Sequence, residues 1–376
     1  MREAWEKYRG WFFWQVALWG VLAVALRLAV VPAEECTPVD ATQVHESIEA
    51  GADWLERGIR PDGRYRYGYF NEDQRISFDY NNTRHTGVMS ALYVNDRIDG
   101  GDTGLEYVQD NLIKRDDWTA FAPPGEPVNV GGNSLLIVAL MNRREATGDE
   151  TYDELAKGLG RFLLSQQQDN GSILQYWTRN TEMPIPDLFG KFSTGEAFYA
   201  YALLDQAFPG EGWDDAAHLV GEYLATERDE AEGNYRQPDH WAAYGLATLA
   251  PDGLSETEVE YARFLAGYFG YLIRYEAQNK GSFLNQLNES GATLGTNGEA
   301  AAALWRVAEQ DDRLADIREP LAERIDCLAG ILVDLQEEGD NPEELEAGAW
   351  FFEGYTQMDD QQHAIAALEA AQDVVQ

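Results

Sequence analysis

One pattern recurs six times between residue 40 and the C-terminal region, and it constrains the fold more than any other feature of the sequence. Each unit has an amphipathic helix, a turn rich in glycine and aromatic residues, an irregular loop and a second helix. In the first helices, apolar residues recur at intervals of three and four with charged residues between them, as in a helix with one exposed face. The second helices are rich in Ala, Gly and Leu on nearly every face, which predicts burial on all sides.

The first helices are expected at residues 41–59, 103–115, 151–168, 212–228, 257–278 and 318–338. The second helices are expected at residues 83–94, 131–143, 193–206, 238–250, 296–310 and 359–373. Six hairpins with exposed first helices and buried second helices can close into a ring, so the predicted fold is all-α, an (α/α)6 toroid. An open helical solenoid is the alternative. The uneven loops, the count of six and the lack of polar capping units favour the ring.

A single long apolar run precedes the repeats, at residues 11–31. Its 21 residues are enough for a helix to cross a hydrocarbon core of about 30 Å. Basic residues precede the run, and Glu34 and Glu35 follow it. The positive-inside rule then places the N-terminus in the cytoplasm. We therefore expect a signal anchor over residues 1–33 that holds a toroid domain, residues 34–376, outside the cytoplasm as a single-pass protein of the cell membrane. A cleaved signal peptide is the alternative.

Acidic residues dominate the charge, with 66 Asp and Glu against 28 Lys and Arg and a formal net charge of −38. This balance excludes nucleic-acid binding through a basic face. So acidic a surface is typical of halophilic proteins, and an ordinary acidic protein from a GC-rich bacterium is the alternative. The two cysteines, Cys36 and Cys327, are too few for a disulfide scaffold or a cysteine-based zinc cluster.

Turns such as LLSQQQDNGSI and helices such as GGNSLLIVALMNR resemble the repeats of the six-hairpin glycosidase-like superfamily. Its members include glycoside hydrolases, sugar epimerases and polysaccharide lyases. The likeness covers nearly all of residues 40–373 but lies in the texture of the repeats, so no single family is identified and no functional residues are carried over. It implies a pocket at the end of the ring where the second helices begin, and a sugar as the ligand.

Polar residues concentrate at the starts of the second helices, which should converge on one face of the ring. Three of the five histidines, His85, His240 and His363, occupy equivalent positions in three repeats. The expected substrate-binding residues are polar or aromatic side chains near these starts: Tyr67, Tyr80, Arg84, His85, Asn133, Trp177, His240, Trp241, Asn297, Asp359 and His363. Aromatic rings suit a sugar cleft because sugars stack on them, although such rings also fill the space between helices.

Three carboxyl groups, those of Glu196, Asp239 and Glu299, are the expected catalytic residues, and we expect them along one arc of the mouth. Burial without a partner would raise the pKa of such a carboxyl group towards the range of a general acid. The alternative is structural, because residues 193–196 resemble a capping box and ion pairs could neutralise the acids. Several residues in this region also suit helix N-caps, namely Ser193, Thr194, Asp239, Thr296 and Asp359.

The expected function is hydrolysis of a glycosidic bond in an oligosaccharide or polysaccharide, by one carboxyl group as acid and another as base. One alternative is a uronate epimerase or polysaccharide lyase, in which His85 or His240 moves a proton and Arg84 holds the substrate carboxylate. Another is a non-catalytic toroid that binds a glycan or a protein at the cell surface. No phosphate-binding or dinucleotide motif is visible in the sequence, so we expect no cofactor. Histidines from repeats one, four and six are not expected to meet, so we expect no metal.

The charge leads to a prediction about salt. Like charges at this density repel one another in dilute buffer, and the screening length falls to about 3 Å at 1 M salt. The melting temperature of the protein should therefore rise steeply between about 0.1 and 2 M KCl. A melting temperature that stays constant over this range would contradict the halophilic interpretation.

Overall fold

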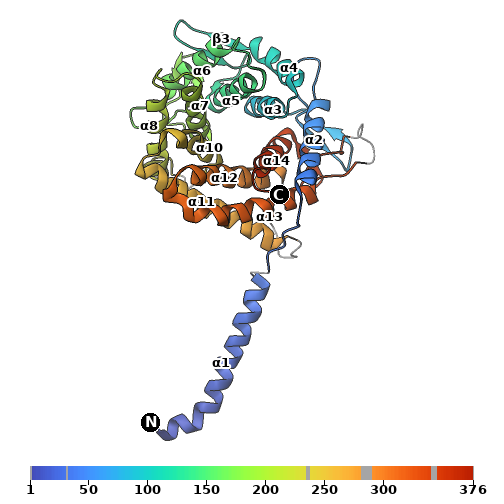
Figure 1. Ribbon diagram of the computed structural model, residues 1–376, viewed down its shortest axis with the longest axis vertical. Helices are drawn as coiled ribbons and strands as arrows, with labels where there is room; N and C mark the ends of the chain where they lie inside the picture. The colour runs from blue at the N-terminus through green and yellow to red at the C-terminus, as the bar shows by residue number, and fades with distance from the viewer. Residues whose placement is uncertain (1, 31–32, 234–237, 281–289, 340–344, 376) are drawn as a thin grey trace.

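A computed structural model describes residues 2–30, 33–233, 238–280, 290–339 and 345–375 (Figure 1). Within these residues the chain forms fourteen α-helices, two short 3-10 helices and eight short strands. Helix α1 (Arg2–Val30) stands apart from the rest of the molecule, and the other long helices build a ring. The all-α prediction is confirmed.

Twelve helices form six consecutive hairpins, each with an outer and an inner member. The outer helices are α2 (Ala41–Arg57), α4 (Ile98–Gln109), α6 (Asp153–Gln166), α8 (Trp213–Thr226), α11 (Glu256–Asn279) and α13 (Arg318–Leu335). The inner helices are α3 (Asn82–Val94), α5 (Val130–Thr147), α7 (Ser193–Ala207), α10 (His240–Leu249), α12 (Gly291–Gln310) and α14 (Met358–Ala371). A short helix, α9 (Arg228–Ala231), lies between α8 and α10, and the 3-10 helices are η1 (Ala250–Asp252) and η2 (Asp312–Ile317).

The inner helices pack against one another in chain order, and the last of them, α14, packs against the first, α3. Two strands from the same repeats also join, because β1 (Gly68–Phe70) pairs antiparallel with β8 (Tyr355–Gln357). The sixth repeat therefore contacts the first, and the ring is closed (Figure 1). The predicted (α/α)6 toroid is confirmed over the open solenoid.

The strands all lie in connections from an outer helix to the next inner helix, so they surround the end of the ring where the inner helices begin. Strand β2 (Arg75–Ile76) extends the β1–β8 pair, and β3 (Leu112–Lys114) pairs with β4 (Thr119–Phe121). A third sheet joins β5 (Val128–Asn129), β6 (Tyr176–Thr178) and β7 (Met183–Pro184). Helix α4 starts before its expected position and ends earlier, and residues expected in it form β3 instead.

Small residues bring the inner helices close together, as predicted. A side-chain Cβ atom on Gly295 of α12 would lie 2.3 Å from the backbone carbonyl carbon of His363 on α14. Only glycine permits this approach, because real Cβ atoms do not come so near a backbone carbon. The contact places α12 side chains directly against the N-terminal half of α14.

Helix α12 begins at Gly291 rather than at the expected residue 296. Its first N–H groups find acceptors outside the helix, since the Asp360 carboxylate accepts from the N–H of Ala292 and the Ser290 hydroxyl accepts from that of Thr293. Satisfied N–H groups and packing on α14 keep this glycine- and threonine-rich segment helical. Thr296 is therefore not an N-cap, and Glu299 lies deeper in the ring than expected.

The other expected caps have mixed outcomes. Asp239 is the N-cap of α10 and accepts from the N–H groups of Trp241 and Ala242. Ser193 and Thr194 are not caps, and the expected capping box is absent, because α7 begins after Phe192 without a side-chain cap bond. Asp359 is also not a cap, because it lies within α14, one residue after the helix begins.

The two cysteines form a disulfide between residues 291 positions apart, which the sequence analysis did not predict. Cys36 follows α1 and Cys327 lies on α13. The neighbouring Glu34 forms ion pairs with Arg274 of α11, at 2.9 Å, and with Arg324 of α13. The segment after α1 is thus fastened to two outer helices.

Candidate functional site

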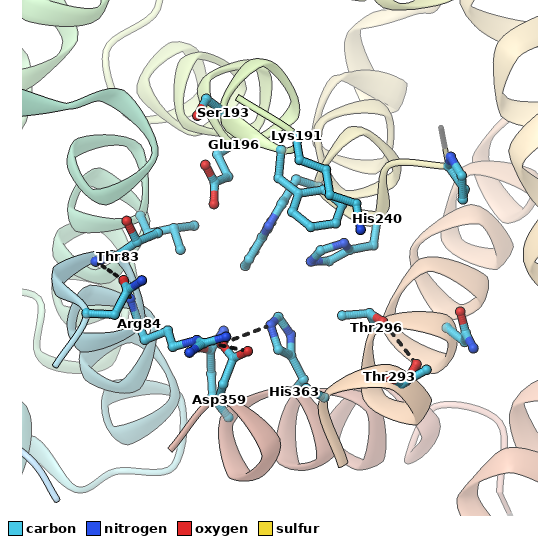
Figure 2. A pocket seen from close by; sticks show the side chains of 18 of the residues that line it. Thr83, Arg84, Lys191, Ser193, Glu196, His240, Thr293, Thr296, Asp359 and His363 are labelled. Carbon is cyan, nitrogen blue, oxygen red and sulfur yellow. Dashed lines mark hydrogen bonds and ion pairs between the residues drawn. The ribbon is translucent and has the colours of Figure 1, made fainter. Parts of the chain in front are cut away.

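The first turns of the inner helices surround a cavity of about 480 Å³, the mouth pocket (Figure 2). Its position confirms that these helix starts converge on one face. Seven of the expected site residues line it, and they are Arg84, Glu196, His240, Trp241, Asn297, Asp359 and His363. The residues come from repeats one, three, four, five and six, so the pocket depends on closure of the ring.

Two histidines at the mouth pocket, His240 and His363, meet edge to face, with ring centroids 5.2 Å apart and ring planes at 82°. They come from α10 and α14. Burial lowers the pKa of His240 well below its ordinary value, and the positive charges of His363 and Lys191 lower it further. Its Nε2 atom is buried and has no hydrogen-bond partner among the described residues. His240 is therefore neutral at pH 7, and its imidazole can accept a proton.

His363 has the opposite electrostatic environment. Burial alone would lower its pKa, but the Glu299 carboxylate, whose Oε1 lies 2.7 Å from Nδ1, and the nearby Asp359 and Asp360 raise it to about 9. Its Nε2 lies 3.7 Å from Oδ1 of Asp359, at the pocket surface. His363 is therefore a cation at neutral pH and can donate a proton.

Arg84 and Asp359 form an ion pair beside His363, with Nε of Arg84 3.1 Å from Oδ2 of Asp359 (Figure 2). The Arg84 guanidinium also donates to the Tyr67 hydroxyl and, at 3.1 Å, to Oε1 of Gln357. These contacts fix the guanidinium at the pocket wall. Tyr67 therefore holds Arg84.

Glu196 lies on the wall of the pocket formed by α7 (Figure 2). Burial, followed by the negative charge of Asp239, raises the pKa of Glu196 to about 8. Its side chain has no hydrogen bond or ion pair with any residue that the structure describes. Glu196 is therefore protonated at neutral pH and can act as an acid.

The other two expected catalytic carboxyls do not line the mouth pocket. Asp239 is fully buried, caps α10 and lies 2.7 Å from Nη1 of Arg228, which is itself buried. Glu299 bonds to His363 and lines a second cavity, of about 220 Å³, deeper in the ring. The expected arc of three carboxyls is thus not formed, because an arginine from α9 holds Asp239 and the early start of α12 sets Glu299 back.

Five expected binding residues also lie outside the mouth pocket, among them Tyr67, which holds Arg84. Tyr80 contacts Nδ1 of His85 at 2.6 Å, and burial lowers the pKa of His85 to about 4. Asn133 accepts from the N–H of Phe121 at 2.7 Å and donates to its carbonyl at 3.0 Å. Trp177 is buried against Trp118. Tyr80 and Asn133 line a smaller neighbouring cavity of about 260 Å³.

Several lining residues escaped the sequence analysis, among them Asn129, Gln175 and Thr293. Asn129 is the N-cap of α5, and Asn81, which also lines the pocket, is the N-cap of α3. The position directly before an inner helix was the signal that could have found Asn129, and no comparable signal marks Gln175 or Thr293.

A metal ion could reach three side chains, since the ligand atoms of His240, Glu299 and His363 all lie within 4.8 Å of one another. His240 and His363 meet, contrary to the expectation for these repeats, whereas His85 does not join them. A metal would have to replace the proton of His363 and break its bond to Glu299. The residues present therefore fit a proton-transfer pair better than a metal site.

No protein-family model matches the chain, and no curated protein matches it in sequence. Solved structures do match over most of their length. A D-mannose isomerase shares 13% identity at a TM-score of 0.60, with 88% of this chain and 97% of that chain covered. The cellobiose 2-epimerase of Spirochaeta thermophila shares 12% identity at a TM-score of 0.60, with 89% and 97% covered.

An α-1,6-mannanase of Salegentibacter, solved as an inactive variant with α-1,6-mannotetrose, shares 14% identity at a TM-score of 0.59, with 89% of this chain and 100% of that chain covered. At these identities the likeness establishes the fold. The chain shares the six-hairpin toroid of these structures, and no family is identified.

Proposed function

We propose that this protein is a carbohydrate-active enzyme that moves a proton at the carbon next to a sugar carbonyl, as an isomerase or epimerase. The observation that carries the proposal is the facing pair of histidines with opposite pKa shifts. Two titratable groups whose environments drive their pKa values apart are the usual arrangement for a general base and a general acid. Likeness to a mannose isomerase and a cellobiose epimerase supports this choice.

Each residue of the site has its own role in the proposed reaction. The neutral imidazole of His240 takes the proton from the substrate carbon, while the His363 imidazolium gives a proton to the carbonyl oxygen, which yields an enediol. If the former carbonyl carbon then gains a proton and the hydroxyl group on the adjacent carbon loses one, the product is the isomer. If the deprotonated carbon regains a proton on its opposite face and the hydroxyl group on the former carbonyl carbon loses one, the product is the epimer. Glu299 holds the imidazolium in its orientation. The Arg84 guanidinium can bind sugar hydroxyl groups beside it.

Hydrolysis of a glycosidic bond is the second candidate, because Glu196 has the raised pKa that a general acid needs. The Asp359 carboxylate lines the same pocket and is the remaining acid that could serve as its partner. Likeness to a mannanase supports this candidate. Hydrolysis would require Asp359 to serve as the base or nucleophile while it is paired with Arg84. Hydrolysis is therefore the weaker of the two candidate functions.

Proton transfer can be tested by incubating the protein with reducing sugars in D2O and following deuterium entry by NMR. Deuterium should enter the carbon next to the carbonyl. His240→Gln and His363→Gln should each lower the rate on the order of a hundredfold or more. His45→Gln is the matched control, because His45 is exposed on α2 far from the pocket.

The same samples should be tested on oligosaccharides for new reducing ends. If a glycan is cleaved without deuterium exchange and Glu196→Gln abolishes the cleavage, hydrolysis replaces proton transfer as the function. Deuterium entry next to a uronate carboxylate, but not next to a sugar carbonyl, would instead indicate a uronate epimerase.

We also propose that α1 anchors the toroid in the cell membrane with the ring outside the cytoplasm. The span Tyr8–Arg27 is long and apolar enough to cross a membrane, and none of it is buried against the ring. A signal sequence would share these properties. The disulfide supports the other part of the proposal, the location of the ring outside the cytoplasm. Disulfides persist in oxidising compartments, and this one lies just beyond α1.

Flotation tests the anchor. Full-length protein reconstituted with phosphatidylcholine vesicles should float with them in a density gradient, and the N-terminal residues should be present in protein isolated from cells. A soluble cellular product that begins near Pro32 would show that the segment is a cleaved signal.

A further inference from the structure

We propose that one outer face of the ring, on α11, lies on the membrane surface and contacts the headgroup layer. We call it the α11 face, and its residues are Arg263, Phe264, Gly267, Tyr268, Tyr271, Arg274 and Tyr275. The inference rests on the proposed membrane anchor, and it goes further because it fixes which side of the ring meets the lipid.

The α11 face lacks the acidic residues that cover the rest of the chain. About one residue in six is Asp or Glu overall, yet residues 261–275 contain none and contain two arginines. The neighbouring outer helix α13 exposes Glu323 and Asp326. Residues 155–168, on and directly after α6, also lack acidic residues, so what distinguishes the α11 face from α6 is its exposed aromatic side chains. The acids that do approach this face, Asp316 and Glu34, each pair with one of its arginines. The face can therefore approach anionic headgroups with less repulsion than the rest of this acidic chain.

The α11 face also exposes aromatic rings. Tyr271 is 62% exposed and Tyr275 is 38% exposed, and their rings stack with centroids 6.1 Å apart. Phe264 and Tyr268 are half-buried on the same side. Among the outer helices that the structure describes, α11 alone exposes large aromatic side chains. Tyrosine is enriched at membrane interfaces, where its ring lies among apolar atoms and its hydroxyl stays hydrated.

The chain path keeps this face close to the bilayer. Helix α1 ends at Val30, and Glu34 is already bound to Arg274, while the N–H of Glu35 donates to the carbonyl of Ala277 at 2.9 Å. Four residue steps at up to 3.6 Å each separate the end of α1 from Glu34, at most about 14 Å. Arg274 lies between the two exposed tyrosines in the sequence. The C-terminal half of α11 is therefore held beside the point where the chain leaves the membrane.

Figure 1 shows α11 and α13 on the side of the ring that faces α1. Because α11 belongs to the outer wall and the mouth pocket opens at one end of the ring, docking of this face directs the mouth along the membrane surface. Substrates would then enter from the side, without passing between the ring and the lipid.

Site-directed spin labelling of the full-length protein in phosphatidylcholine vesicles tests the inference. Both cysteines are in the disulfide, so a nitroxide can be attached to one new cysteine, at Tyr271→Cys or Gly267→Cys. Gly267 has open space around it, so its variant should fold even if Tyr271→Cys does not. Leu164→Cys, at an exposed position on α6, is the matched control.

The labels on α11 should collide more often with oxygen than with a water-soluble nickel chelate, and the label on α6 should show the reverse. If the protein floats with the vesicles but the α11 labels are as accessible to nickel as the α6 label, the inference is wrong and the anchor stands. If the reconstituted protein does not float, the anchor is wrong and the inference falls with it.

Discussion

The hydrogen-bonded pair of Glu299 and His363 is the interaction on which the proposed chemistry depends. It joins α12 to α14, the inner helices of the last two repeats, at an Nδ1–Oε1 distance of 2.7 Å. The pair can form because Gly295 lets the two helix backbones approach. The same α14 packs against α3 and brings Asp359 to Arg84 of the first repeat. Closure of the ring and assembly of the mouth pocket therefore involve the same helix.

Both facing histidines are buried, and burial by itself favours the neutral form of each. The adjacent carboxylate of Glu299 is the reason that the pKa values of the two histidines differ. It raises the pKa of His363, whereas His240 has no such partner among the described residues. The folded pKa of His363, about 9, lies above its ordinary value of 6.5. The pair therefore stabilises the fold fully below pH 6.5, and this contribution is lost as the pH rises through 9. Glu196 contributes a pH dependence of the same sign. Its pKa is raised from 4.5 to about 8, and ionising this buried carboxyl costs stability as the pH rises through that range.

Much of the fold was predictable because helical periodicity and small-residue content are local properties of the sequence. These two properties predicted the six hairpins, the buried inner helices and the end of the ring where the pocket lies. The start of α12 was not predictable, because its N–H groups are satisfied by Asp360, far along the chain. The partner of Asp239 was missed for a similar reason, since Arg228 lies on a short helix with no periodic pattern. The disulfide joins residues that only the closed ring brings together.

The central claim is that Glu299 makes His363 an acid and leaves His240 a base. NMR titration of the imidazole nitrogens in protein labelled with 15N-histidine tests it most directly, since the chain has only five histidines. The account predicts a pKa of about 9 for His363 and a pKa well below 6.5 for His240. In Glu299→Gln, where burial remains but the negative charge is gone, the pKa of His363 should fall towards or below 6.5. A His363 that titrates near 6.5 in the native protein, or whose pKa is the same in Glu299→Gln, would contradict the account.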